Sequence, residues 1–137
     1  MSKKINMDFL AAFIELEGAC NRLLDKKRSG VTEYINRLED SGAASRKDEL
    51  FKKLIFYRKI RNKLAHEEGA LDDLNDVDKT DVKWLGNFRK KVEKGRDPLS
   101  LHIKKADRRR LWSIVKITAI ASVIVAVIII AIVFALK

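Results

Sequence analysis

The twenty residues from Ile117 to Leu136 constrain this chain most, because none of them carries a charge. At about 1.5 Å per residue, a helix of this length crosses a hydrocarbon core of ~30 Å. The segment therefore predicts a transmembrane helix over 117–136. The N-terminal region has no comparable apolar run, since Asp8, Glu15 and Glu17 interrupt it, and we expect no signal peptide there.

A basic cluster immediately precedes the apolar segment and forms most of a juxtamembrane region, 97–116. Such a cluster holds the preceding residues in the cytoplasm, and Trp112 suits the interfacial aromatic belt. We therefore expect a single-pass membrane protein with a cytoplasmic N-terminal domain and its C-terminus across the membrane. Membrane lipid is the expected contact of the cluster, and an RNA-binding patch is the alternative. Its members are Lys104, Lys105, Arg108, Arg109, Arg110 and Lys116, opposed by Asp107.

Within the apolar segment, Thr118, Ser122 and Ala126 recur at four-residue steps on one helical face. Small residues at this spacing let two membrane helices approach closely. The pattern is equally typical of a plain anchor with ordinary alanine content. Both interpretations stay open at this point.

Residues 1–96 show the 3.6-residue period of helices and no strand pattern. We predict helices over about 5–27, through Tyr34 to Leu38, over about 46–66 behind a Ser45–Asp48 capping box, and from Thr80 or Asp81 onward. The turn around Ser29–Gly30, the stretch 39–42 and the acidic stretch 67–78 are expected to be loops. The fold class is thus all-α, a small antiparallel bundle followed by one C-terminal transmembrane helix. Asp97–Pro98 resembles the start of that last helix.

Chemistry is concentrated in one hexapeptide near the end of the third predicted helix, Arg61-Asn62-Lys63-Leu64-Ala65-His66. The chain has only two histidines and one cysteine, Cys20, so most metal sites and nucleophilic triads cannot be assembled within one copy. We expect no cofactor and no metal. Cys20 lies on an apolar helical face, as a small core residue does, and forms no disulfide framework.

The hexapeptide resembles the Arg-x4-6-His signature of the HEPN superfamily, in which a small polar residue, often Asn, follows the arginine. The resemblance is closest over about twenty residues around the motif and extends loosely over 5–95. It implies a HEPN-like bundle that dimerises, so that two motifs form one composite, metal-independent ribonuclease site. It assigns the catalytic roles to Arg61, Asn62 and His66.

Two other features bear on this interpretation. Phe51 and Ile55 share a helical face with Asn62 and His66, and that face suits contact with a second subunit. The alternative for the motif is structural: Arg61 pairs with Asp8, Glu15 or Glu17 of the first helix, and His66 only caps the end of its own helix.

With the predicted transmembrane helix, the resemblance implies a membrane-anchored HEPN-type effector, an endoribonuclease of prokaryotic defence or toxicity. Its expected partners are further copies of itself, membrane lipid, and RNA or an RNA-guided effector protein. The alternative is a non-enzymatic oligomeric effector of the kind found among CRISPR-associated proteins, which uses its HEPN-like bundle for assembly and perturbs the bilayer. A span this apolar has no polar lining, so a pore would have to be a hydrophobic one.

Overall fold

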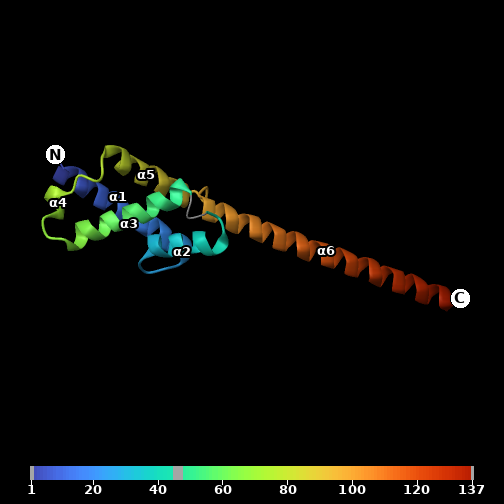
Figure 1. Ribbon diagram of the computed structural model, residues 1–137. Helices are drawn as coiled ribbons and strands as arrows, with labels where there is room; N and C mark the ends of the chain where they lie inside the picture. Colours follow the sequence, from blue (N-terminus) through green and yellow to red (C-terminus); the bar gives the residue numbers. More distant parts are fainter. Residues whose placement is uncertain (1, 45–47, 137) are drawn as a thin grey trace. The chain divides into compact units, whose positions relative to one another are not determined.

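The computed structural model describes residues 2–44 and 48–136, and within them every regular element is a helix (Figure 1). The chain forms two compact units, Met1–His102 and Ile103–Lys137. The all-α class and the long apolar C-terminal helix are as the sequence predicts. The helices are α1 (Ser2–Leu24), α2 (Gly30–Ser41), α3 (Glu49–His66), α4 (Ala70–Asp73), α5 (Lys79–Glu93) and α6 (Pro98–Ala135).

Helix α1 supplies one wall of the core of the first unit and packs against α2, α3, α4 and α5. Its predicted apolar face is buried, with Phe9 and Leu16 fully inaccessible to solvent and Phe13 and Cys20 nearly so. Opposite it, α5 buries Leu85 and Phe88. The core therefore closes between the first helix of the chain and one that lies about seventy residues later.

Helix α2 differs from the expectation at both ends. It begins at Gly30, which was expected in a turn, and continues to Ser41 through residues that were expected to form a loop. Gly30 is needed because a Cβ atom there would lie 2.5 Å from the backbone N of Asn21 and 2.7 Å from the backbone O of Glu17. The close approach of α2 to α1 thus depends on a glycine. Gly42, with φ of 65°, ends α2 in the left-handed conformation that glycine adopts readily.

Helix α3 begins after Asp48, which stands at its N-cap without a side-chain capping bond. Ser45, the other half of the predicted capping box, lies outside the described residues. The acidic stretch after α3 contains the short helix α4, which the sequence analysis did not expect. Asn6 of α1 holds it, because the fully buried Nδ2 atom donates to the carbonyl oxygens of Leu71 and Leu74 at 3.0 and 2.9 Å.

Helix α5 begins at Lys79, one or two residues before the predicted start. Its capping box is formed by Asp78, whose carboxylate accepts from the N–H groups of Thr80 and Asp81 at 2.7 and 3.0 Å. The Asp81 side chain accepts from the Asp78 N–H in return. These bonds satisfy N–H groups that no helical carbonyl can reach and so fix where α5 starts.

The predicted start of the last helix is confirmed, with Asp97 as N-cap and Pro98 as the first helical residue. The Asp97 carboxylate accepts from the Ser100 N–H at 3.1 Å. Asp97, Leu99 and Ser100 are all buried, so the first turn of α6 belongs to the core of the first unit.

In the second unit, α6 continues through the predicted transmembrane segment. Among the described residues it is the part long and apolar enough to cross a membrane, and none of its most apolar stretch is buried. The hydroxyl of Thr118 donates to the carbonyl oxygens of Ile114 and Val115, and that of Ser122 donates to Ala119. Both hydroxyl protons are therefore used within the helix, and with Ala126 the two residues form a stripe of small side chains.

Candidate functional site

The motif residues lie in the last two turns of α3. Ile60 and Leu64 of the same turns are buried in the core, so the other faces of these turns point outward. Asn62 and His66 are exposed, and Arg61 is half-buried. The Nη1 atom of Arg61 donates to Oδ1 of Asn62 at 3.3 Å. The guanidinium is thus held by a neutral side chain, which does not offset its positive charge.

The structural alternative for Arg61 requires an acidic partner on α1. Glu15 instead pairs with Arg89 at 3.4 Å, and the Glu17 carboxylate accepts from the Val31 N–H at 3.3 Å. Within residues 2–44 and 48–136, Arg61 has no ion pair. His66 is the last residue of α3, a place where a cationic side chain is favoured, so the capping role for His66 stays open.

One copy does not bring the arginine and the histidine together. Five residues of helix rotate the chain by roughly 500°, which places Arg61 and His66 about 140° apart around the α3 axis. Asn62 and His66, four residues apart, share a face. The two side chains therefore leave the α3 axis on different faces.

The face predicted to contact a second subunit, Phe51, Ile55, Asn62 and His66, is only partly exposed to solvent. Phe51 is 1% exposed and packs in the core of its own chain, contrary to the expectation that it contacts a second subunit. The physical reason is that α3 turns this side of its first turns toward the bundle interior. Ile55 is half-buried against the same core, so outer contacts on this face fall to Ile55, Asn62 and His66.

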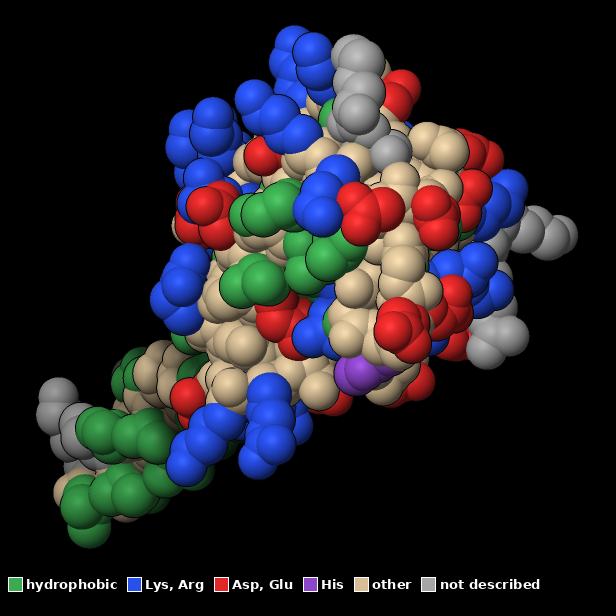
Figure 2. Space-filling view, turned by 90° about the vertical axis from the view of Figure 1, so that its left-hand side faces the viewer, with side chains coloured by type: hydrophobic (Ala, Val, Ile, Leu, Met, Phe, Trp, Pro, Cys, Tyr) green, Lys and Arg blue, Asp and Glu red, His purple; other side chains and the backbone are tan. Residues whose placement is uncertain are grey.

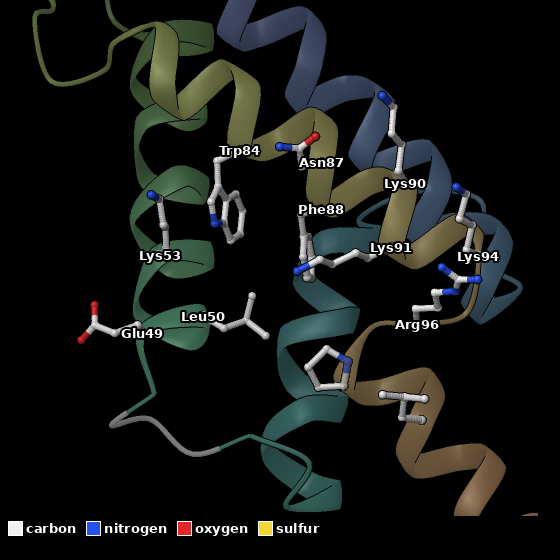
Figure 3. Close-up of a pocket in the computed structure, with 12 residues that line it drawn as sticks. Glu49, Leu50, Lys53, Trp84, Asn87, Phe88, Lys90, Lys91, Lys94 and Arg96 are labelled. Carbon is white, nitrogen blue, oxygen red and sulfur yellow. The ribbon is translucent and has the colours of Figure 1, made fainter.

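A second candidate site, which the sequence analysis missed, is an open groove of about 950 Å³ at the other end of α3 (Figure 3). Its apolar floor includes Leu50, Trp84, Phe88 and Pro98, and cationic side chains surround that floor. We call this site the cationic groove. It is lined by Glu49, Leu50, Lys53, Trp84, Asn87, Phe88, Lys90, Lys91, Lys94, Arg96, Pro98 and Leu101.

The aromatic floor of the cationic groove is already in contact with protein groups. Trp84 stacks on Phe88 with ring centroids 5.0 Å apart, and the Nζ atom of Lys53 lies 5.2 Å from the Trp84 ring. The same ammonium lies 3.8 Å from Oδ1 of Asp81, which also accepts the Tyr57 hydroxyl at 2.6 Å. Burial raises the pKa of Tyr57, and the hydrogen bond to Asp81 is the second-largest cause of the rise. Tyr57 is thus a neutral donor that fixes the wall of the groove.

The outer cations of the groove have no such partners. Lys90, Lys91, Lys94 and Arg96 are exposed, and none of the four forms an ion pair with any described residue. The acid that lines the groove, Glu49, pairs with Lys52 at 3.2 Å. The groove therefore presents an excess of positive charge beside apolar surface. Four of its five cations lie within residues 90–96, and only folding brings Lys53 of α3 beside them.

A buried polar group lies under the start of α6 and is structural. The Tyr34 hydroxyl donates to Asp97 at 2.6 Å, and burial together with that bond raises the pKa of Tyr34. Burial, with smaller contributions from Glu17 and Asp97, raises the pKa of the Cys20 thiol to about 12. Neither group ionises near neutrality, so neither is a nucleophile there.

Among the described residues, no cluster of three or more His, Cys, Asp or Glu side chains is placed to hold a metal.

Comparison with known proteins adds a family and no assigned activity. No curated protein and no solved structure matches this chain. One family model, described as a family of unknown function (DUF6548), matches residues 7–112, which include the whole bundle core, the motif and the cationic groove. The chain therefore belongs to the DUF6548 family of unknown function.

Proposed function

We propose that the protein is anchored in a membrane by α6, with residues 1–102 in the cytoplasm. The exposed apolar stretch of α6 supports the insertion, since an unburied helix of this composition is costly in water. The cations between Lys104 and Lys116 support the orientation. Trp112 lies among them, at the level where an indole suits the membrane interface.

We propose further that the bundle is a HEPN-type endoribonuclease, with a site completed by a second subunit. The observation that carries this proposal is the state of Arg61: a half-buried guanidinium with a neutral neighbour and no acidic partner among the described residues. A cation maintained without a counter-charge suits an anionic ligand such as a phosphate. His66 is exposed one turn beyond Asn62 and shares its helical face.

The chemistry would be a transesterification that needs no metal. His66 takes the proton of a ribose 2′-hydroxyl, the 2′-oxygen attacks phosphorus, and the bond between phosphorus and the 5′-oxygen breaks. The partner subunit's His66 donates a proton to the leaving 5′-oxygen. Arg61 stabilises the charge on the phosphorane, and Asn62 orients the phosphate or the histidine. The products are a 2′,3′-cyclic phosphate and a 5′-hydroxyl.

The second candidate is a non-enzymatic effector that acts by oligomerising in the bilayer. The small side chains of Thr118, Ser122 and Ala126 favour it, because they leave a surface on which a second helix can pack. The hydroxyl protons of Thr118 and Ser122 are already used within α6. In this case the bundle mediates assembly, and the motif residues are only structural parts of α3.

The two candidates separate in one experiment on cells that express the full chain. Wild type, Arg61→Ala and His66→Ala are scored for RNA cleavage and for membrane potential, with His102→Ala as the matched control. General acid–base catalysis contributes about 10²–10⁴-fold, so His66→Ala should abolish detectable cleavage, and chelators should have no effect. Cleavage by His66→Ala equal to wild type would exclude the ribonuclease. Membrane depolarisation by all four proteins would support the second candidate.

A further inference from the structure

Two surfaces of opposite charge lie at opposite ends of α3 and α5. The segment 67–78, here called the acidic segment, contains six acidic residues and no basic one. It joins the end of α3 to the start of α5 and includes α4. Figure 2 views the bundle from the side that carries α4 and shows several acidic side chains there, with a histidine beside them. The six acids are Glu67, Glu68, Asp72, Asp73, Asp76 and Asp78.

The cationic groove lies at the opposite ends of the same two helices. Helix α3 starts at the groove with Glu49 and ends at the acidic segment, whereas α5 starts at the acidic segment and reaches the groove with Lys90 and Lys91 (Figure 1). Eighteen residues of α3 span roughly 27 Å. One molecule therefore cannot bring its own acidic segment into its own groove.

Neither surface is neutralised within its own chain. Lys90, Lys91, Lys94 and Arg96 have no ion pair among the described residues, and the same holds for four acids of the acidic segment. The acidic segment is also held in shape, because Asn6 binds the backbone within α4 and at its C-cap, Leu74. A preorganised surface loses less entropy on binding than a free loop. The four unpaired acids are Glu67, Glu68, Asp73 and Asp76.

We propose that the cationic groove of one copy binds the acidic segment of a second copy. The two surfaces differ, so the contact is heterologous, and each copy keeps one surface free for a further neighbour. Repetition gives a closed ring or an open chain of bundles. Confinement of the copies to one membrane would raise their effective concentration and favour this assembly.

The contact also changes the surroundings of the motif, a consequence that rests on the proposed ribonuclease. Glu67 and Glu68 follow His66 directly and repel phosphates. In the assembly, a neighbour's lysines and arginine offset these charges. The acidic segment then ceases to oppose RNA binding at His66.

Charge suits any anionic occupant, and the contacts of the aromatic rings in the groove argue against single-stranded nucleic acid. Proteins that bind single strands usually offer free aromatic faces on which bases stack. In the groove, Phe88 and Lys53 already contact Trp84, and Phe88 is itself only 5% exposed. RNA and anionic lipid are therefore the outcomes that would contradict the proposal.

A charge-exchange experiment on the full chain in a neutral detergent tests it. One variant reverses the groove (Lys90→Glu, Lys91→Glu, Lys94→Glu), and the other reverses the acidic segment (Glu68→Lys, Asp73→Lys, Asp76→Lys). We expect each alone to associate at least about tenfold more weakly than wild type in sedimentation, and an equimolar mixture of the two to regain association. The mixture restores both contacts in alternation, because the reversed groove of one variant meets the reversed acidic segment of the other, and the unaltered groove meets the unaltered segment.

A third variant controls for net charge, with Lys27→Glu, Arg28→Glu and Lys59→Glu, three exposed cations outside the groove. It should associate as wild type does. Circular dichroism establishes that each variant is folded. Association of folded variants that is unchanged by groove reversal, or a mixture that does not regain it, would overturn the proposal. So would loss of binding to anionic vesicles or to RNA on groove reversal while self-association persists. RNA cleavage is scored separately, so failure of the ribonuclease leaves this result intact.

Discussion

The hydroxyl of Tyr34 lies 2.6 Å from the carboxylate of Asp97, and both side chains are fully buried. This bond joins α2 to the first turn of α6. The same carboxylate also accepts from the Ser100 N–H, so one acidic group both caps α6 and fastens it to the bundle. A second pair, Tyr57 and Asp81, has the same bond length, but Asp81 is partly exposed.

The two tyrosine–aspartate pairs should differ in their contribution to stability. Tyr34→Phe leaves a buried carboxylate with one donor fewer and should lower the free energy of unfolding by about 1–3 kcal/mol. Tyr57→Phe should cost less, because Asp81 keeps Lys53 nearby and reaches water. Denaturant titration of the full chain in detergent measures both. Equal losses would mean that burial of the acceptor does not set the cost.

Two glycines should respond to alanine in opposite directions. Gly30→Ala should destabilise the bundle by about 1–3 kcal/mol, because its Cβ would meet the backbone of α1. Gly86→Ala, in the interior of α5 with open space around its Cβ position, should stabilise by about 0.5–1 kcal/mol. Thermal unfolding followed by circular dichroism gives the sign of each. A stabilising Gly30→Ala would contradict the close approach of α1 and α2.

Removal of the Asn6 side-chain amide should release α4. Asn6→Ala deletes two donors to backbone carbonyls and leaves a small cavity, so residues 70–76 should exchange their amide hydrogens faster than in wild type. Hydrogen exchange read by mass spectrometry measures this by segment. Exchange in α5, which has its own capping box, should change less and serves as the internal control.

The Cys20 thiol should resist labelling in the folded protein. Burial holds it in the neutral form up to a pKa of about 12, whereas an exposed thiol ionises near 8.5. Iodoacetamide at pH 8.5 should therefore modify native protein far more slowly than denatured protein. The shift also has a sign for stability: its contribution is complete below pH ~8.5 and is lost as pH rises toward 12. Rapid native labelling would contradict the burial of Cys20.

The stripe on α6 can be tested with substitutions that keep the span hydrophobic. Ser122→Leu with Ala126→Leu obstructs close helix approach at a cost of about 1 kcal/mol per contact, while Ser122→Ala preserves it. If the span only anchors the bundle, RNA cleavage should persist in both variants. It should also persist when the span is replaced by an unrelated transmembrane helix. Loss of activity in the leucine variant alone, with the bundle folded, would assign assembly to this face.

The sequence was enough to predict a helix where a single local pattern, such as helical periodicity or an N-cap, determines it. The apolar faces of α1 and α5 follow the helical period, and Asp97–Pro98 marked the start of α6 as an N-cap followed by proline. Helix α4 was missed because four residues are too few to show a period. Gly30 was expected in a turn because glycine often breaks helices, whereas here contact with α1 requires it at a helix start.

The candidate sites depended on information that the sequence holds only in part. The motif was found because its residues are close in the chain. Phe51 was placed on an outer face because helical spacing gives directions around an axis and not the position of the neighbouring helices. The cationic groove brings Lys53 of α3 beside Lys94 and Arg96, which follow α5, and Asn6 meets a backbone 65 to 68 residues away. Such proximity arises only on folding.

The hydrogen bonds that join α1 to α4 and α2 to α6 link residues 63 to 68 positions apart. A helical domain that depends on such distant contacts must close long loops before they can form, which slows folding relative to bundles with local contacts. Phe9 contacts Tyr57 of α3, and the core is complete only when α5 packs against α1. A nick between α3 and α5 would therefore separate the two walls of the core, so proteolysis in the acidic segment should unfold the bundle cooperatively.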